Sequence, residues 1–397
     1  MDSAPLLSGH GKSQGPKKGR THPMTNSRFL QIHSLHGYSA VLLNRDDAGL
    51  AKRIEYGGAM RTRISSQCLK RHWRVADSVH ALTGIDGAAT ATRSREIVTL
   101  NVVKPLTEAG FAADVVKAVE QAFQTAVYGD KGDQRGNRQP LLLGSPEIEF
   151  LAGEATRIAK MPPDEAKVAA SAWAKASKAN MKAMREQCSL PGGLVAALFG
   201  RMVTSDVEAN IDAAVHVAHA FTVHREESES DYFTVVDDLR RIEDDPGADH
   251  IGETELTCGL FYGYVVVDRQ VLLNNLGGDA AMAGEVCRRL VHLVATVSPG
   301  AKLGSTAPYG YASWMLVEAG DRQPRSLAEA FRRPCASSTE EAEAALSQHL
   351  ERLDETYDTG EMRRTMSLSR ATMPRAELVS LPELAAWTGR AIERGQA

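Results

Sequence analysis

The run Leu260-Phe261-Tyr262-Gly263-Tyr264-Val265-Val266-Val267 decides the fold that this sequence predicts. Apolar and aromatic residues fill it almost completely, which is typical of a buried strand. Downstream, residues 280–297 have a helical pattern that ends before Pro299-Gly300, and residues 311–317 indicate a second strand. Upstream, residues 29–35 alternate between apolar and polar side chains, as in a strand with one buried face. These segments predict strand–helix units around a small sheet.

A long helical segment divides these units. Residues 75–190 are Ala-rich with a helical pattern, interrupted by a Gly/Asp/Arg-rich loop at 129–140. We expect a further apolar helix at residues 215–221, and helices with loops across residues 326–397. Strand–helix units split by such an insertion predict an α+β protein, in which a sheet core carries a helical lobe.

Length and composition limit the class of protein. A chain of 397 residues suggests two or three structural units, and 43% hydrophobic with 24% charged residues is ordinary for a soluble globular protein. The five cysteines are scattered without a CxxC pair, which excludes a zinc ribbon and fits a reducing cytoplasm. No apolar run approaches the ~18 residues of a membrane span. Residues 1–23 lack the apolar region of a signal peptide, so we expect a disordered leader or an added extension.

Charge is unevenly distributed, although the formal net charge is only −4. Residues 45–74 carry eight Lys/Arg against three acids, whereas residues 225–255 carry twelve acids against three arginines. A basic and an acidic region on one chain suit the steering of a polyanion, and they also suit head-to-tail contact between copies.

The basic region contains Arg63-Ile64-Ser65-Ser66-Gln67-Cys68-Leu69-Lys70-Arg71-His72-Trp73-Arg74. Positions i, i+3, i+4 and i+7 of a helix lie on one face, and here they are Gln67, Lys70, Arg71 and Arg74. Ser65 or Ser66 would cap this helix. A capped helix start followed by a basic stripe can hold a row of phosphates, although a solvated charged face is the ordinary alternative.

A second basic stripe is expected in the helical lobe. Its members lie within about a quarter of the helix circumference at 100° per residue. They are Lys167, Lys175, Lys178, Lys182 and Arg185. The stripe is either a solvated face or a non-specific phosphate contact.

No pattern of residues in the sequence supports an enzymatic activity. His216, His219 and His224, with Asp237 and Asp238, can be drawn as a metal site, but core or capping histidines are the better interpretation. The zinc-protease and phosphate-loop motifs are missing from the sequence. We therefore expect no catalytic residue, metal or cofactor.

Several blocks, taken together, resemble one family. The blocks are Asn44-Arg45-Asp46-Asp47, Tyr56-Gly57-Gly58, residues 63–71, Gly200-Arg201-Met202-Val203-Thr204-Ser205, residues 219–224, residues 231–238 and Pro299-Gly300-Ala301-Lys302. In this order they resemble the CasC family, the backbone subunit of the type I-E CRISPR surveillance complex Cascade. The resemblance spans most of residues 28–320.

The resemblance implies a modified RRM-type, ferredoxin-like palm with a helical fingers lobe and a protruding thumb. The implied divisions are palm at 24–74, fingers at 75–190, palm strand and thumb at 191–258, and palm with C-terminal helices at 259–397. Several copies would stack head-to-tail along one crRNA and present its bases to target DNA. The other implied partners are the large subunit, the small subunit, the repeat-handle-binding subunit and the crRNA-processing endonuclease subunit.

The resemblance also assigns residues to roles. Guide RNA phosphates would be bound by Arg45, Lys52, Ser65, Ser66, Gln67, Lys70, Arg71, Arg74 and Lys302. Met202, Tyr232 and Phe233 resemble wedge and thumb-tip residues that displace one base at a regular interval. The lysine-rich finger helix, here Lys175, Lys178, Lys182 and Arg185, would contact DNA.

Two other classes of function stay open at this point. Related backbone subunits cut RNA with a loop aspartate, and Asp46 and Asp47 lie in a comparable loop. The chain is also compatible with a helical scaffold protein that binds no nucleic acid.

Overall fold

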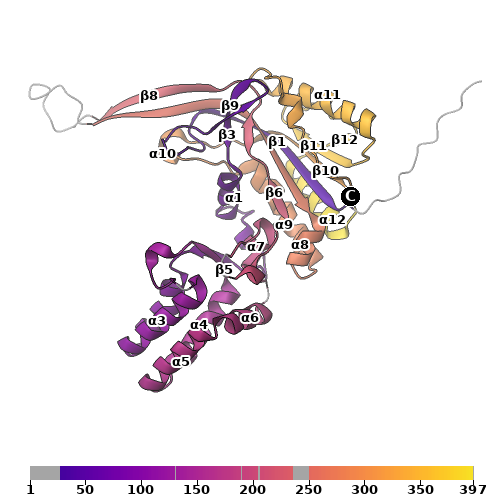
Figure 1. Ribbon diagram of the computed structural model, residues 1–397. Helices are drawn as coiled ribbons and strands as arrows, with labels where there is room; N and C mark the ends of the chain where they lie inside the picture. The colour runs from indigo at the N-terminus through magenta and orange to yellow at the C-terminus, as the bar shows by residue number, and fades with distance from the viewer. Residues whose placement is uncertain (1–26, 130, 189, 204–205, 236–249, 397) are drawn as a thin grey trace, which may run out of the picture.

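The computed structural model describes residues 27–129, 131–188, 190–203, 206–235 and 250–396. Its body is a ten-stranded sheet in which β1 (Phe29–Val41) lies between β10 (Ala312–Gly320) and β9 (His250–Asp268). The strand order is β12-β11-β10-β1-β9-β7-β3-β2, and β6 and β8 also pair with β9. Figure 1 shows this sheet above a separate helical lobe, with one long hairpin projecting sideways.

Two interlocked strand–helix–strand units build the sheet. β9 and β10 both run antiparallel to β1, so they are parallel to each other, and α8 (Arg269–Asn275) and α9 (Ala280–Thr296) connect them. β1 and β7 (Ala220–Thr222) both run antiparallel to β9, so they are also parallel to each other. Helix α1 (Ser66–Arg74) lies between them in the sequence. This is the ferredoxin-like arrangement, and it confirms the predicted α+β class.

Each face of the sheet has its own apolar core. Leu30, Ile32 and Val317 pack with α9 and α12 (Leu381–Arg394) on one face. Leu35 and Trp314 pack with α11 (Thr339–Tyr357) on the other. Because neighbouring strand residues alternate between faces, the apolar run of β9 supplies both cores: Val265 to one and Tyr262 to the other.

The helical lobe is inserted between α1 and β6 (Val215–Val217). Phe123 and Trp173 stack in its separate core with their ring centroids 3.8 Å apart. The lobe contains α2 (Lys104–Glu108), α3 (Ala113–Tyr128), α4 (Ser145–Ala159), α5 (Pro163–Lys175), α6 (Ser177–Gln187) and α7 (Gly193–Phe199). It also has a two-stranded antiparallel sheet of β4 (Ala91–Ser94) and β5 (Leu141–Gly144). The sequence predicted the helices of this lobe but not its two strands.

The projecting hairpin consists of β8 (Glu227–Val235) and the first half of β9. A shorter hairpin, β2 (Arg53–Tyr56) and β3 (Ala59–Ile64), lies at the edge of the sheet and leads into α1. In Figure 1 the long hairpin extends from the top of the body on the side where α1 lies. Within the described residues, no helix is both long and apolar enough to cross a membrane.

Two secondary-structure predictions are wrong. The apolar stretch 215–221 forms β6 and β7 instead of a helix, because both segments pair with the buried β9. Residues 326–397 contain α11 and α12 but also β11 (Met362–Ser367) and β12 (Ala376–Leu378), which extend the sheet beside β10. In both places, hydrogen bonding to the free edge of a buried strand determines the secondary structure, and the local sequence pattern does not.

A buried ion pair closes the helical lobe at its sheet-facing end. The Arg201 guanidinium lies 2.7 Å from Glu147 Oε1, and both side chains are almost fully buried. Glu147 Oε2 also accepts the backbone N–H groups of Gly144 and Gly192, each at 2.8 Å. The carboxylate therefore ties α4, β5 and the start of α7 together.

We predict that Arg201→Met lowers the free energy of unfolding by about 3–5 kcal/mol, because it leaves the Glu147 charge buried without its cation. Denaturant unfolding, with hydrogen exchange of α4, measures the effect. Arg157→Met is the control, since the exposed Arg157–Glu154 pair is worth less than about 1 kcal/mol. Equal effects of the two substitutions would contradict the structural role of the buried pair.

Candidate nucleic-acid interface

Helix α1 begins where the sequence predicted. The Ser65 hydroxyl oxygen accepts the N–H of Cys68 at 3.3 Å, which is the bond of an N-cap residue. The Ser65 N–H in turn donates to Asn44 Oδ1 at 2.9 Å. Ser65 is buried, so its polar groups serve the helix start and the 44–47 loop, whereas Ser66 is half-buried beside Gln67. Trp73 anchors the other side of α1 in the core.

The cations of α1 have no acidic partner in the described part of the chain. Lys70 instead lies over the Phe199 ring, with Nζ 5.9 Å from the ring centroid, and burial lowers the pKa of its ammonium group. Burial, and then the charges of Arg93 and Arg71, lower the pKa of the Arg74 guanidinium. Arg71 is exposed. These residues form a group of like charges without an acidic side chain among the described residues to neutralise them.

Lys52 joins this surface from the side. Its charge acts on Cys68 of α1 and on His219, and burial, Arg63 and Lys52 together lower the pKa of the His219 imidazole. We call Lys52, Lys70, Arg71, Arg74 and Arg93 the basic surface. Some arginines elsewhere in the described chain are paired with acids: Arg53 contacts both Glu226 and Glu255, and Arg289 contacts Glu285 at 2.6 Å.

Two predicted phosphate contacts lie outside the basic surface. Arg45 and Lys302 line a hollow of about 580 Å³ at the root of the long hairpin, together with Glu229, Glu253 and Glu255. Lys302 donates to the hydroxyl of Thr254 on β9. These two cations therefore lie among acids, in a mixed-charge environment that differs from that of α1.

The expected wedge residues are exposed. Met202 is 79% exposed and Tyr232 is 62% exposed. Tyr232 and Phe233 follow each other on β8, so their side chains point to opposite faces of the hairpin. The Phe233 ring covers Gly252 on β9 so closely that a Cβ there would clash, and it lies 5.7 Å from Lys302 Nζ. Because the two aromatic rings lie on opposite faces of the hairpin, they cannot both insert at the same base step.

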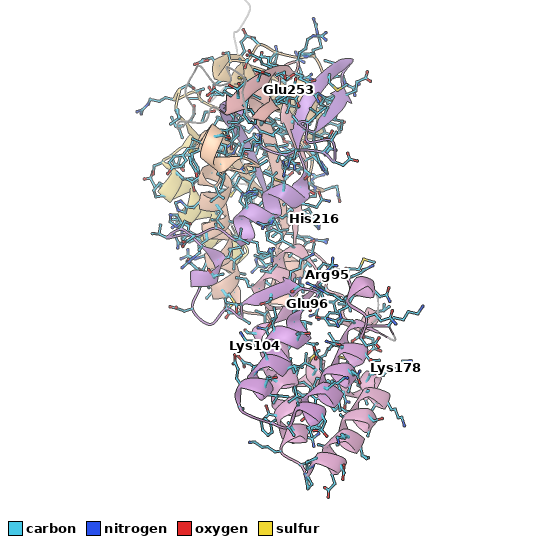
Figure 2. All side chains as sticks on the ribbon, turned by 90° about the vertical axis from the view of Figure 1, so that its left-hand side faces the viewer. Arg95, Glu96, Lys104, Lys178, His216 and Glu253 are labelled. Atoms are coloured by element: carbon cyan, nitrogen blue, oxygen red, sulfur yellow. The ribbon has the colours of Figure 1, made fainter. Side chains whose placement is uncertain are left out.

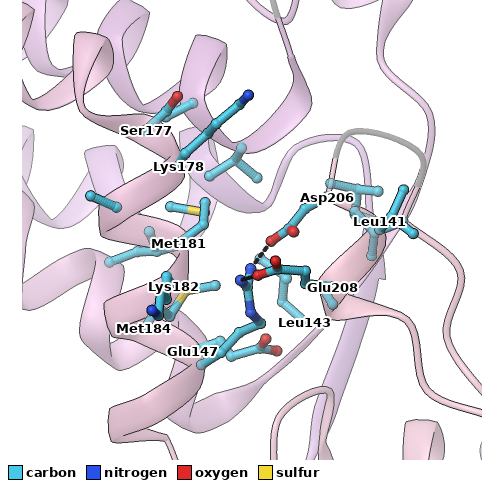
Figure 3. Close-up of a pocket in the computed structure, with 18 of the residues that line it drawn as sticks. Leu141, Leu143, Glu147, Ser177, Lys178, Met181, Lys182, Met184, Asp206 and Glu208 are labelled. Carbon is cyan, nitrogen blue, oxygen red and sulfur yellow. Dashed lines mark hydrogen bonds and ion pairs between the residues drawn. The ribbon is translucent and has the colours of Figure 1, made fainter.

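The predicted stripe of the helical lobe is broken. The chain forms two helices, α5 and α6, joined at Ala176. Lys175, Lys178 and Lys182 are exposed, but Arg185 is paired with Asp206 and Glu208 across a pocket of about 480 Å³. Figure 3 shows these two acids pointing into the pocket that Lys178 and Lys182 border. Arg185 is therefore engaged by two acids, which disfavours a contact with a DNA phosphate.

The three histidines do not converge on a site. His216 donates to the Ala213 carbonyl at 3.0 Å, His219 contacts Arg63 at 3.0 Å, and buried His224 accepts the Leu260 N–H at 3.0 Å. Asp237 and Asp238 lie outside the described residues. Among the residues that the structure describes, no group of three His, Cys, Asp or Glu could hold a metal ion.

The aspartates of the loop before β2 differ in their contacts. Asp46 Oδ1 accepts the Leu50 N–H at 2.9 Å and so closes the turn, while Asp47 is exposed. The Asp46 carboxylate therefore stabilises the turn of this loop. The same loop is bonded to the start of α1 through Asn44, which accepts the Ser65 N–H.

Sequence reasoning missed Arg93 and Phe199. Arg93 lies on β4 of the inserted lobe, and Phe199 ends α7, yet both approach the α1 cations. The only signal was the spacing Arg93-x-Arg95 in a segment that had been expected to be helical.

Figure 2 views the side from which the hairpin projects and shows Glu253 above, with Arg95, Lys104 and Lys178 on the lobe below.

Comparisons with known proteins show the family and the fold of this chain. The model of the family described as "CT1975-like protein" matches residues 30–387. A chain of a "CRISPR RNA-guided surveillance complex, pre-nicking" is 28% identical, with a TM-score of 0.76, and the match covers 92% of this chain and 100% of that chain. A chain of a "CRISPR RNA-guided surveillance complex" is 24% identical, with a TM-score of 0.66 and coverages of 91% and 99%, and shows the fold alone. No curated protein matched.

We predict that Ser65→Ala lowers the free energy of unfolding by about 1 kcal/mol, because α1 loses its N-cap acceptor. Ser66→Ala is the matched control, since the Ser66 hydroxyl contacts only Gln67 Oε1, at 3.4 Å. Urea denaturation of the two variants measures the difference. If both substitutions have the same effect, Ser65 is not the cap on which α1 depends.

Proposed function

The chain belongs to the family of CT1975-like proteins, and we propose that it is a crRNA-binding backbone subunit of a Cascade-type CRISPR surveillance complex. The observation that carries the proposal is the basic surface, a group of neighbouring cations without acidic partners among the described residues. Its finer form is the CasC subunit of a type I-E complex, acting in the cytoplasm without catalysis. The sheet body would be the palm, the helical lobe the fingers and the long hairpin the thumb.

The basic surface would hold the guide by its phosphates. Lys70, Arg71 and Arg74 follow each other along one side of α1, so they can contact successive phosphates of one strand. Lys52 and Gln67 extend this track, and Ser66 adds a hydroxyl at its start. Phosphate contacts fix the position of an RNA without reading its sequence. Such a surface suits a guide whose spacer varies from one complex to the next.

Base displacement would come from Met202 and Tyr232. Both side chains are exposed and free of the hairpin packing that holds Phe233 against Gly252. Unstacking one base step costs a few kcal/mol, and contact with an inserted apolar side chain offsets it. We assign Phe233 and Lys302 to bracing the thumb beside the guide, since Lys302 Nζ lies 5.7 Å from the Phe233 ring centroid. The segments between displaced bases would pair with target DNA, so base pairing carries the specificity.

The thumb would contact the next copy in a head-to-tail filament. Glu226 and Glu255 are already paired with Arg53 of the same chain, so they are not available for this contact. Glu227, Glu229, Asp231 and Glu253 remain exposed on the hairpin. A rod of acids projecting from the body suits a basic surface on a second copy. The exposed Lys175, Lys178 and Lys182 would contact target DNA, and the other Cascade subunits would complete the assembly.

We predict that Lys70→Ala/Arg71→Ala reduces the slope of log affinity against log salt for single-stranded RNA by about 1.4, because two phosphate contacts are lost at about 0.7 each. Affinities measured across a salt series give the slope.

The matched control for this experiment is Arg390→Ala/Arg394→Ala. These exposed arginines lie one turn apart on α12, on the other side of the body from the hairpin in Figure 1. An unchanged slope in the α1 variant, or an equal loss in both, would show that RNA does not bind on α1.

A further inference from the structure

The chain crosses between the sheet body and the helical lobe twice. It leaves the body through residues 75–90, after α1, and it returns through residues 210–214, before β6. Arg93 follows the outgoing crossing in sequence and Arg74 precedes it, yet the Arg93 charge acts on Arg74. The basic surface is therefore shared between two parts of the fold, and its geometry depends on how the lobe is held.

Helix α9 holds the outgoing crossing. The Arg289 guanidinium donates to the Ala81 carbonyl at 2.6 Å and to the Gly84 carbonyl at 2.9 Å. Glu285, one turn earlier on α9, accepts from the same guanidinium at 2.6 Å, which fixes the orientation of the Arg289 side chain. Arg289 therefore joins α9 of the body to the backbone that leads into the lobe.

The polar face of α9 continues to a stacked pair of imidazoles. Glu285, Arg289 and His292 occupy positions i, i+4 and i+7, so they share one side of the helix. The His292 ring stacks on the His80 ring of the crossing, with the ring centroids 3.7 Å apart. The apolar residues of α9 pack in the core of the body. One face of α9 is thus directed at residues 80–84.

Helix α8 holds the returning crossing through a single side chain. The Asn275 Nδ2 group donates to the Asp212 carbonyl of the returning segment and to the Ala197 carbonyl near the end of α7, both at 2.9 Å. The last carbonyls of a helix lack partners within it, and Asn275 supplies one here. Figure 1 shows α7 beside α8, where the lobe meets the body.

The junction between α1 and the lobe is not close-packed. An open hollow of about 230 Å³ separates Arg74 and Val75, at the end of α1, from residues 88–91 and from Leu194 of α7. Leu194 anchors α7 in the core of the body. A close-packed junction would fix α1 and the lobe directly, whereas a hollow leaves their relative position to contacts elsewhere. Those contacts lie on α8 and α9.

We propose that Arg289 and Asn275 are positioning residues, which hold the helical lobe where Arg93 joins the α1 cations in one phosphate-binding surface. Neither side chain is part of the basic surface, so each acts on RNA only through the backbone that it holds. Loss of either contact removes the contribution of Arg93 and leaves that of Lys70 and Arg71. The proposal rests on the proposed function, because it takes this surface as the binding site of the guide.

The salt dependence of binding to a single-stranded RNA of mixed sequence tests the role of Arg289 in the full chain. Arg93→Ala should reduce the slope of log affinity against log salt by about 0.7, the value for one phosphate contact. Arg289→Met should reduce the slope equally, and Arg93→Ala added to it should have no further effect. Arg288→Met is the matched control, because the Arg288 side chain is bonded to the same Glu285 at 2.6 Å but to no carbonyl of the crossing.

Asn275→Ala is an independent variant on the other crossing, and it should show the same slope and the same lack of additivity with Arg93→Ala. Its control is Asn274→Ala, since the exposed Asn274 side chain only accepts the Gln270 amide, at 3.1 Å. A general loss of folded protein would leave the slope of the remaining folded chains unchanged. A reduced slope that is not additive with Arg93→Ala therefore reports the position of the lobe.

An unchanged slope in Arg289→Met or in Asn275→Ala, or an equal reduction in their controls, would overturn the proposal. So would an unchanged slope in Arg93→Ala, or a further reduction when it is added to either variant. If Lys70→Ala/Arg71→Ala still loses about 1.4 in these cases, the basic surface stands and the positioning role alone is wrong. If that variant also keeps the wild-type slope, the proposed function fails with it.

Discussion

Strand β9 is the constraint on which the rest of the molecule depends. Its 19 residues pair with β1 and β7 in the body, and with β8 in the projecting hairpin. The hairpin is therefore a continuation of a buried central strand and not a loosely attached loop. Because β7 also pairs with β3, which leads directly into α1, the same strand fixes the hairpin relative to the helix that carries the basic surface. The fold thus places a projecting arm and a cationic helix on one side of the body.

Repulsion between the cations of the basic surface destabilises the isolated chain, whereas a bound polyanion would relieve it. Like charges at neighbouring positions repel one another, and the lowered pKa of Lys70 and Arg74 reflects burial of cations without acids beside them. Arg363, by contrast, is buried and is bonded to both Glu318 and Asp354 at 2.6 Å. The α1 cations have no such partner among the described residues, and this is the basis of the proposed RNA contact. Arg93 adds a cation from the inserted lobe to the same surface.

Local sequence signals predicted much of the fold and part of the site. The buried run of β9, the helix α9 and the capped helix α1 follow from residues that are close in sequence, and all three are confirmed. The predicted helix at 215–221 failed because strand pairing to β9 is a long-range contact that periodicity does not contain. Arg185 looked free because its partners, Asp206 and Glu208, are about 20 residues away on another segment. Arg93 joins the basic surface only through the return of the inserted lobe, so no spacing within α1 could reveal it.

Photo-crosslinking is the measurement that tests the central claim most directly. The full chain would be bound to single-stranded RNA containing a photoreactive uridine at many positions, irradiated, digested and mapped by mass spectrometry. The account predicts crosslinks concentrated in residues 66–74 and 91–94 and in the segment that contains Met202, whatever the RNA sequence. Crosslinks confined to α5 and α6, or scattered without preference over the surface, would contradict the claim that the unpaired cations of α1 hold the guide.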